Sequence, residues 1–162
     1  MMIDAMTGAV LLEKNADDPM PPASMSKLMT LLMVFERLED GSISLEDTMR
    51  VSEAAWRMGG SRMFVEHNSR VSVEDLLRGV IIQSGNDASV VFAEGLSGSE
   101  EAFADEMNSR AAEIGLTGST FRNATGWPDP EHRTTARDLT TIAARIINAF
   151  PEYYAIFQEK EY

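Results

Sequence analysis

The sequence predicts an α+β fold in which one short N-terminal β-hairpin precedes a mostly helical chain. Two short apolar runs flank Thr7 and Gly8 within residues 3–14, a pattern typical of a hairpin. Most of the remaining chain follows a helical repeat of apolar residues, with Ser or Thr before the predicted starts and Gly after several ends. Since the chain has 162 residues, of which 44% are hydrophobic and 25% charged, we expect one globular domain over residues 1–162.

The charge balance and the absent residue types exclude several classes of function. The formal net charge is −12 at pH 7, which argues against nucleic acid or an anionic membrane surface as a partner. The sequence has no cysteine, so disulfides, thiol catalysis and cysteine-ligated metals are excluded. His67 and His132 lie far apart in the sequence and form no His-x-x-x-His pair. We therefore expect no metal site and no cofactor.

The first residues do not have the composition of a targeting segment. Residues 1–6 contain neither the basic stretch nor the apolar stretch of a signal peptide. The longest apolar run, near residues 28–35, is too short to span a bilayer. We expect the chain as given to be soluble, and to be either a mature protein or a piece of a longer precursor.

The first predicted helix covers residues 24–38 and follows a proline-rich loop at residues 15–22. One face of this helix carries, at helical spacing, Ser24, Lys27, Leu28, Leu31, Phe35 and Leu38. Met25, Met29 and Met33 are expected to pack in the core, so that little of the helix is polar and it is predicted to be buried. Gly41 is placed to cap its C-terminal end.

The middle of the chain predicts two helices separated by a break. Residues 42–58 are expected to form short helical turns, and residues 62–66 and 70–71 a small hairpin. Ser72, with Asp75 as its capping partner, begins a helix whose apolar stripe ends at Ser84. The sequence then predicts a break at Gly85, a cap at Asn86, and a helix over residues 87–94 that Gly95 ends.

The last third predicts two more helices joined by a long loop. Ser99 caps a helix that Gly115 ends, and residues 117–134 form the loop, which His132 is expected to organise. Thr135 caps the final helix, with Asp138 three residues on, and Pro151 stops it. No internal repeat or low-complexity segment interrupts this order.

The residues that carry chemistry are Ser24, Lys27, Ser84 and Asn86. Serine is a poor nucleophile until a base removes its proton, and a lysine three residues along a helix is within reach. A lysine can serve as that base only if burial lowers its pKa, and Lys27 lies on an otherwise apolar stripe. Ser84 is placed to relay a proton to a leaving amine, and Asn86 to hold a substrate amide and orient Lys27.

Each of these residues also has a purely structural interpretation. Ser24 would be an ordinary N-cap, Lys27 a surface lysine and Asn86 a second cap. A Ser-x-x-Lys pattern alone is common. The evidence for a catalytic site is the combination of Ser-x-x-Lys with Ser-Gly-Asn, in this order and with each motif at a helix end.

The segment at residues 22–30, Pro-Ala-Ser-Met-Ser-Lys-Leu-Met-Thr, resembles the nucleophile segment of the low-molecular-mass penicillin-binding proteins, the serine-type D-alanyl-D-alanine carboxypeptidases. Ser-Gly-Asn at residues 84–86 is similar to their second motif. Residues 4–10, 121–126 and 134–138 resemble the family's earlier and later segments, so the resemblance covers almost the whole chain.

This resemblance implies a hydrolase with a penicillin-binding protein/β-lactamase-like transpeptidase fold. Ser24 would attack the terminal D-Ala–D-Ala bond of a peptidoglycan pentapeptide, with Lys27 as the base, and β-lactams would acylate the same serine. Class A β-lactamases carry Ser-Asp-Asn at the second motif, so Gly85 favours the carboxypeptidase branch. The family is typically exported, which implies a location in the cell envelope.

The sequence departs from the family pattern in one respect. The third family motif, Lys-Thr-Gly on a strand beside the nucleophile, does not occur. In the family this strand supplies an oxyanion N–H, and the loss of one such donor costs ~10²–10³ in rate. We therefore expect a partial catalytic domain that lacks the later sheet strands and is prone to aggregate or needs a complementing segment, because the helix at residues 24–38 would expose apolar surface. A β-lactamase-like or esterase-like hydrolase and a catalytically inactive fragment that binds peptidoglycan or a partner remain the alternatives.

Overall fold

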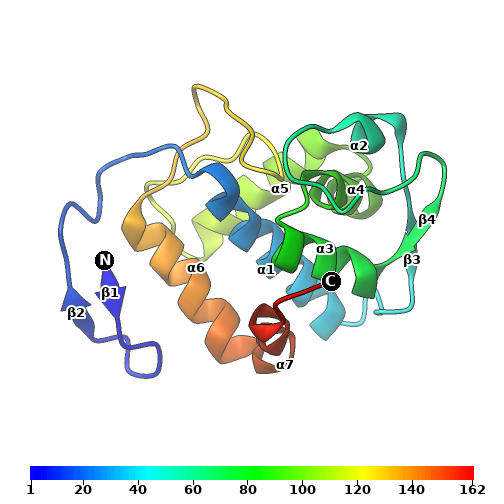
Figure 1. Ribbon diagram of the computed structural model, residues 1–162. Coiled ribbons are helices and arrows are strands. Elements are labelled where there is room, and N and C mark those ends of the chain that lie inside the picture. Colours follow the sequence, from blue (N-terminus) through cyan, green and yellow to red (C-terminus); the bar gives the residue numbers. More distant parts are fainter.

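Helix α1 (Lys27–Glu39) runs through the middle of the molecule in the computed structural model, which describes residues 1–162 (Figure 1). Helices α4 (Asn86–Ser97), α5 (Glu100–Glu113) and α6 (Ala136–Ala149) pack against it. The two sheets are each a single antiparallel pair of strands. The predicted α+β fold, with one N-terminal hairpin and a mostly helical remainder, is therefore confirmed. No helix combines the length and the apolar character that a crossing of the bilayer requires.

The burial of α1 corrects one expectation. Every residue from 29 to 35 is buried, including Met29 and Met33, because α4, α5 and α6 cover this helix from different sides. The prediction that the segment at residues 24–38 would expose apolar surface is therefore wrong for residues 29–35 and holds at its start, where Met25 is 50% exposed. The prediction that Met25 packs in the core is wrong.

The N-terminal hairpin carries several of the exposed apolar side chains. Strand β1 (Met2–Ile3) pairs with β2 (Val10–Leu12), and Asp4 accepts hydrogen bonds from the Thr7 N–H and hydroxyl at the turn. The three residues of β2 are 49–61% exposed, and the hairpin lies beside α6 at the edge of the molecule (Figure 1).

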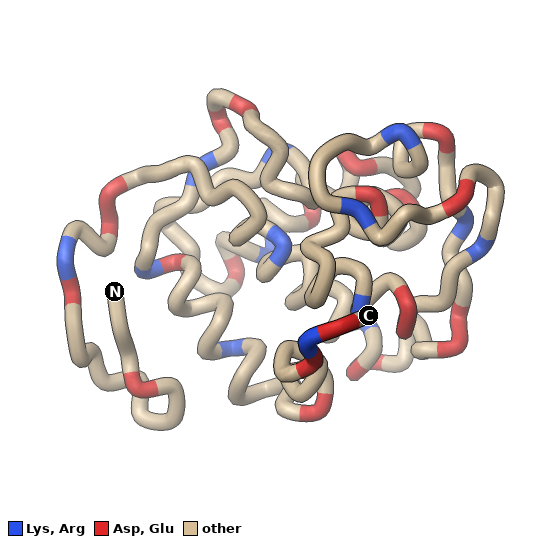
Figure 2. Tube along the Cα trace, in the orientation of Figure 1, with Lys and Arg blue, Asp and Glu red and all other residues tan.

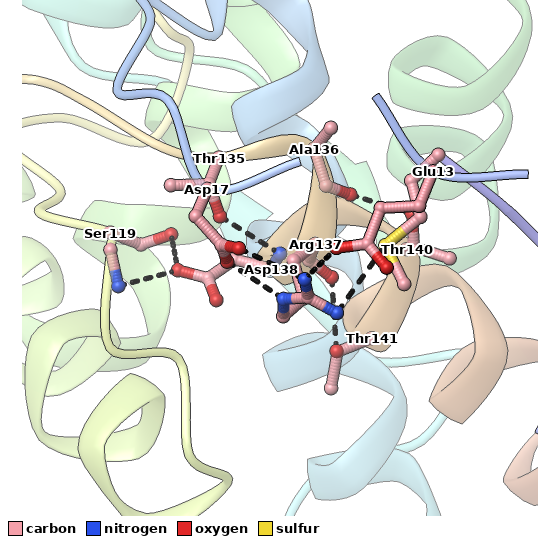
Figure 3. Close-up of polar contacts among 11 residues, drawn as sticks. Glu13, Asp17, Ser119, Thr135, Ala136, Arg137, Asp138, Thr140 and Thr141 are labelled. Atoms are coloured by element: carbon pink, nitrogen blue, oxygen red, sulfur yellow. Dashed lines mark hydrogen bonds and ion pairs between the residues drawn. The ribbon is translucent and has the colours of Figure 1, made fainter. Parts of the chain in front are cut away.

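The first residues of α6 join this N-terminal region to the helices (Figure 3). The Arg137 guanidinium donates to Asp17 at 2.7 and 2.9 Å and forms an ion pair with Glu13. The neighbouring Asp138 carboxylate is buried and accepts from Gly118 N at 2.9 Å and Ser119 Oγ at 2.7 Å. Two adjacent side chains thus fix the N-terminal segment and the long loop to the same helix end.

Three predicted helix starts are confirmed in atomic detail. Ser72 begins α3 (Val73–Gln83) and accepts from Asp75 N at 3.1 Å. Ser99 and Thr135 cap α5 and α6 in the same way, each through the backbone N–H three residues on. These caps can be predicted from the sequence because all their atoms belong to one turn of the chain.

The predicted small hairpin at residues 62–71 is wrong in its first strand. Strand β4 (Arg70–Ser72) pairs instead with β3 (Thr48–Arg50), which precedes the short helix α2 (Glu53–Arg57). The backbone N–H groups of residues 63–65 all donate to the buried carboxylate of Asp87, at 2.9–3.2 Å. Donors already held by a side chain are unavailable for a strand ladder.

The helix end predicted at Gly95 differs from the structure, and the end predicted at Pro151 is confirmed. Helix α4 continues through Gly95 to Ser97, because Gly95 serves close packing: a Cβ there would lie 2.5 Å from the Met49 sulfur. Helix α6 ends before Pro151, but Pro151 then begins the short helix α7 (Pro151–Tyr154), a favoured position for proline. A 3-10 turn, Ala155–Gln158, leads to the C-terminus beside α3.

Candidate active site

The amine of Lys27 is the centre of a buried polar cluster. The Lys27 side chain is only 4% exposed, and its Nζ makes three hydrogen bonds. It lies 3.2 Å from Ser24 Oγ, 2.7 Å from Asn86 Oδ1 and 2.9 Å from the Thr125 carbonyl oxygen. Of the four residues predicted to carry chemistry, the structure thus brings Ser24, Lys27 and Asn86 together.

Ser24 lies in a 3-10 turn, Ala23–Ser26, and α1 begins only at Lys27. Residue 23 adopts a left-handed conformation (φ +47°) that is uncommon for alanine. Gly126 packs directly on it, since a Cβ at Gly126 would lie 1.7 Å from the Ala23 carbonyl oxygen. The Ser24 hydroxyl caps no helix, so the structural interpretation of Ser24 as an N-cap is wrong and its Oγ is free to face Lys27.

Burial lowers the pKa of Lys27 from 10.5 to about 8, because the charged amine loses its hydration. The three groups it contacts are uncharged, so none offsets this loss with an opposite charge. A sizeable share of the amine is therefore neutral in mildly alkaline solution. This is the condition that a lysine must meet to accept a proton from serine.

Hydrogen-bond chemistry determines which way the neutral amine points. Asn86 Nδ2 donates to the Gly59 carbonyl at 2.8 Å, which leaves Oδ1 as the atom that faces Lys27. Asn86 Oδ1 and the Thr125 carbonyl can only accept, so they take the two N–H groups of a neutral amine. The hydroxyl of Ser24 is the only one of the three partners able to donate. The nitrogen lone pair is therefore left for the Ser24 proton.

Asn86 is not the helix cap that the sequence predicts. Gly85 occupies the N-cap position, and Asn86 is the first residue of α4. Its backbone N–H donates to Ser61 O at 2.8 Å, so Asn86 fixes the segment at residues 59–61 as well as Lys27. Gly60 is required there, because a Cβ would lie 2.7 Å from Asn86 Nδ2.

Ser84 stands apart from this cluster. It adopts the left-handed conformation (φ +53°) between α3 and α4, so the break expected at Gly85 falls one residue earlier. Its hydroxyl is half-buried and makes no hydrogen bond, either with Ser24 or with Lys27. Ser84 is therefore near Asn86 in the sequence, but it is not part of the hydrogen-bonded cluster around Lys27.

The Thr125 carbonyl is the contact that sequence reasoning missed. It belongs to the long loop between α5 and α6, and the preceding carbonyl, of Ala124, accepts from the Thr30 hydroxyl of α1 at 2.8 Å. Two consecutive carbonyls thus fix this loop to α1. A backbone acceptor has no residue type of its own, and only the nearby Asn123 and Gly126 marked the segment as a defined turn.

His132 organises the loop, as predicted. Its Nδ1 accepts from Arg122 N at 3.4 Å, so the ring hydrogen is on Nε2, which lies 2.8 Å from Ser26 Oγ. Burial lowers the pKa of His132, which favours this neutral ring. His132 therefore ties the loop to the 3-10 turn that carries Ser24.

Two surface grooves border the cluster, and the exposed Trp127 lines both. One, of about 370 Å³, is lined mainly by Pro21, Pro22, Ala23 and residues 126–130. The other, of about 420 Å³, includes Gly59, Glu100 and Thr125. Acidic residues are spread along the whole Cα trace (Figure 2). No three His, Asp or Glu side chains lie together in a way that could hold a metal ion.

The chain is similar to known proteins along its whole length. The sequence profile that describes D-alanyl-D-alanine carboxypeptidases matches residues 1–162. The chain belongs to this family. Fold and family membership therefore agree with the resemblance drawn from the motifs.

Carboxypeptidase relatives match the chain along most of its length. D-alanyl-D-alanine carboxypeptidase DacF of Bacillus subtilis is 43% identical over 147 residues, which is 91% of this chain and 38% of the relative. DacC of Escherichia coli is 41% identical over 168 residues, covering 100% of this chain and 42% of the relative. The chain thus spans about two fifths of the length of these curated relatives.

Solved structures of penicillin-binding proteins share the fold. Penicillin binding protein 5 from Haemophilus influenzae has a TM-score of 0.95 at 40% identity, over 99% of this chain and 47% of that one. Penicillin-Binding Protein D2 from Listeria monocytogenes, solved in its ampicillin-bound form, has a TM-score of 0.81 at 29% identity, over 93% of this chain and 61% of that one. The helices and small sheets of this carboxypeptidase-family chain therefore form part of a larger known fold.

Proposed function

We propose that this chain provides the nucleophile and base of a serine-type D-Ala-D-Ala carboxypeptidase. Ser24 Oγ attacks the carbonyl carbon of the penultimate D-Ala while its proton passes to the Lys27 amine. The bond to the terminal D-Ala nitrogen then breaks, the leaving amine takes a proton, and water later releases the acyl group from Ser24. The observation that carries the proposal is the buried Lys27 amine, whose lone pair is left for Ser24.

The cluster is also suited to the protonated state of the base. After it accepts the proton, Lys27 has three N–H groups, and three oxygens surround it at 2.7–3.2 Å. The ammonium is thus stabilised by contacts that exist before the reaction. Ser84, at the end of α3, is proposed to relay the proton to the leaving amine, and Asn86 to bind a substrate amide.

The proposed substrate is a peptidoglycan pentapeptide ending in D-Ala-D-Ala, and the proposed location is the cell envelope. The family description supports this substrate, and the ampicillin-bound relative supports β-lactams as covalent inhibitors. The glycine of the Ser-Gly-Asn motif favours a carboxypeptidase over a class A β-lactamase, which carries aspartate there. A Cβ at Gly85 would lie 3.0 Å from the Gly79 carbonyl oxygen and 3.1 Å from Asp87 Oδ1, so a side chain at this position would require these neighbours to move by a few tenths of an ångström.

The direct test is acylation of the 162-residue chain by a fluorescent penicillin, followed by intact mass and peptide mapping. We expect one adduct per chain. Cleavage after Lys14 and Lys27 gives a peptide of residues 15–27, in which fragmentation distinguishes Ser24 from Ser26. A folded chain that gains no mass, or an adduct on Ser26, would contradict the proposal.

The rate of acylation should depend on pH through Lys27. The protonated amine cannot accept the Ser24 proton, and burial places its pKa at about 8. The rate is therefore expected to rise by about tenfold per pH unit below this value and to level off above it. Penicillin labelling that is quenched at set times, from about pH 6 to about pH 10, measures the rate on both sides of that pKa. A rate that stays constant across this range would show that no group with such a pKa acts as the base.

A further inference from the structure

The side-chain amide of Asn123 makes five hydrogen bonds inside one turn of chain, residues 123–127. Its Oδ1 accepts from the backbone N–H groups of Thr125, Gly126 and Trp127, at 3.2, 2.7 and 3.0 Å. It also accepts from Thr125 Oγ1 at 3.1 Å, and Nδ2 donates to the Trp127 carbonyl at 3.0 Å. One amide therefore satisfies most of the polar groups of this turn, and only an amide can both accept and donate in this way.

The turn at residues 123–127 contacts both partners of the proposed chemistry. The Thr125 carbonyl accepts from Lys27 Nζ at 2.9 Å. Gly126, whose N–H makes the shortest bond to Asn123, packs on the Ala23 carbonyl directly before Ser24. The turn that Asn123 stabilises therefore contacts the base, Lys27, through Thr125, and it packs beside the nucleophile, Ser24, through Gly126.

We propose that Asn123 is a positioning residue for acylation of Ser24: its side chain shapes the turn that holds the Thr125 carbonyl on the Lys27 amine. This inference rests on the proposed function. Asn123 makes no hydrogen bond to Ser24 or Lys27, and it acts by fixing one of the two acceptors that direct the amine lone pair to the serine. Without that acceptor the amine would rotate, and water would reach it.

The charged side chains near Lys27 all have other partners, so they do not set the environment of its amine. Asp87 of α4 binds the backbone of residues 63–65, and Glu100 of α5 accepts from Ala124 N at 3.0 Å. His132 binds Ser26, and the Arg62 guanidinium lies over the Phe64 ring. None of these side chains makes a hydrogen bond or ion pair with the amine, so its environment depends on burial and on its three uncharged partners.

The test compares Asn123→Ala with a matched control, Asn108→Ala. Asn108 also binds the long loop, through the Phe121 N–H at 2.8 Å and the Phe121 carbonyl at 2.8 Å, but it makes no bond to residues 123–127. Both variants lose amide hydrogen bonds to the same loop and should lose comparable thermal stability. Only Asn123→Ala is expected to slow penicillin acylation, by about 10–100-fold, because small displacements of catalytic groups cost this much.

The second readout is the pKa of Lys27 itself, which does not require an active protein. The sequence has only three lysines, Lys14, Lys27 and Lys160, so a chain labelled with ¹³C at the lysine Cε gives few resonances. Because desolvation is what lowers the pKa of Lys27, Asn123→Ala should raise it from about 8 toward 10.5, and Asn108→Ala should leave it unchanged. Asn123→Asp keeps the accepting oxygen but loses the donation to the Trp127 carbonyl, so it is expected to recover only part of the acylation rate.

The outcomes separate this inference from the proposed function. A wild-type chain that does not acylate overturns the function, while the Lys27 titration still reports on Asn123. A wild-type chain that acylates, together with a folded Asn123→Ala that matches it in rate and in the Lys27 pKa, overturns the positioning role. Equal losses in Asn123→Ala and Asn108→Ala would also overturn it, since they would indicate general loosening of the loop.

Discussion

Replacing Ser24 with alanine will abolish the penicillin adduct, whereas Ser26→Ala will retain it. The two serines lie two residues apart in the same 3-10 turn, but their hydroxyls have different partners. Ser24 Oγ faces the Lys27 amine, and Ser26 Oγ, fully buried, faces His132 Nε2 at 2.8 Å. Only Ser24 faces a nitrogen with a lone pair to accept its proton, because the His132 nitrogen that faces Ser26 already carries a hydrogen.

The pair of variants makes this experiment specific. Ser26→Ala leaves the His132 N–H without its acceptor, which is expected to cost about 1–3 kcal/mol of folding stability. The less stable variant should therefore be the one that still reacts. An adduct that survives Ser24→Ala, or one that Ser26→Ala alone removes, would show that the nucleophile has been assigned to the wrong serine. Thermal unfolding of both variants confirms that each is folded during labelling.

Replacing Lys27 with methionine is expected to slow acylation by about 10²–10⁴-fold, the usual contribution of a general base. Methionine approximates the length of lysine and fits a buried site, but it offers no lone pair of comparable basicity and no N–H for Asn86 or Thr125. Lys27→Arg should be similarly slow, because a guanidinium keeps its proton at any accessible pH. The measurement is the second-order rate of penicillin labelling at about pH 9, where the wild-type amine is mostly neutral.

Lys14→Met is the control for the loss of a positive charge. Lys14 is exposed, and its substitution should leave the rate unchanged. The two Lys27 variants also separate base catalysis from packing. If Lys27→Arg kept a wild-type rate, Lys27 would serve only as a hydrogen-bond donor, and its proposed role as the base would be wrong.

Features that depend on a single turn of chain could be predicted from the sequence. The caps at Ser72, Ser99 and Thr135 involve atoms at most three residues apart, and the structure places each as expected. The pairing of Ser24 with Lys27 is also local, since one helical turn joins them. Such features need no knowledge of the fold, because the residue types and their spacing define the geometry.

Features that depend on distant contacts were predicted less well. Residues 63–65 read as a strand, but a carboxylate more than twenty positions away binds their N–H groups. Gly95 reads as a helix end, but it is needed for the close approach of Met49. The residue types marked a turn around Thr125 but not the contact of its carbonyl with Lys27. In each case the deciding partner is identified only once the helices are in place.

The long sequence separations within the Lys27 cluster have a consequence for folding. The amine binds partners 59 and 98 positions away, on α4 and in the loop before α6. Closing loops of this length is slow and entropically costly, so these contacts form only after much of the topology is in place. Until then Lys27 is a hydrated, protonated side chain and Ser24 an ordinary hydroxyl. Under the proposed mechanism, a nascent or partly folded chain is therefore chemically inert at Ser24, and the serine becomes reactive only as the native state is completed.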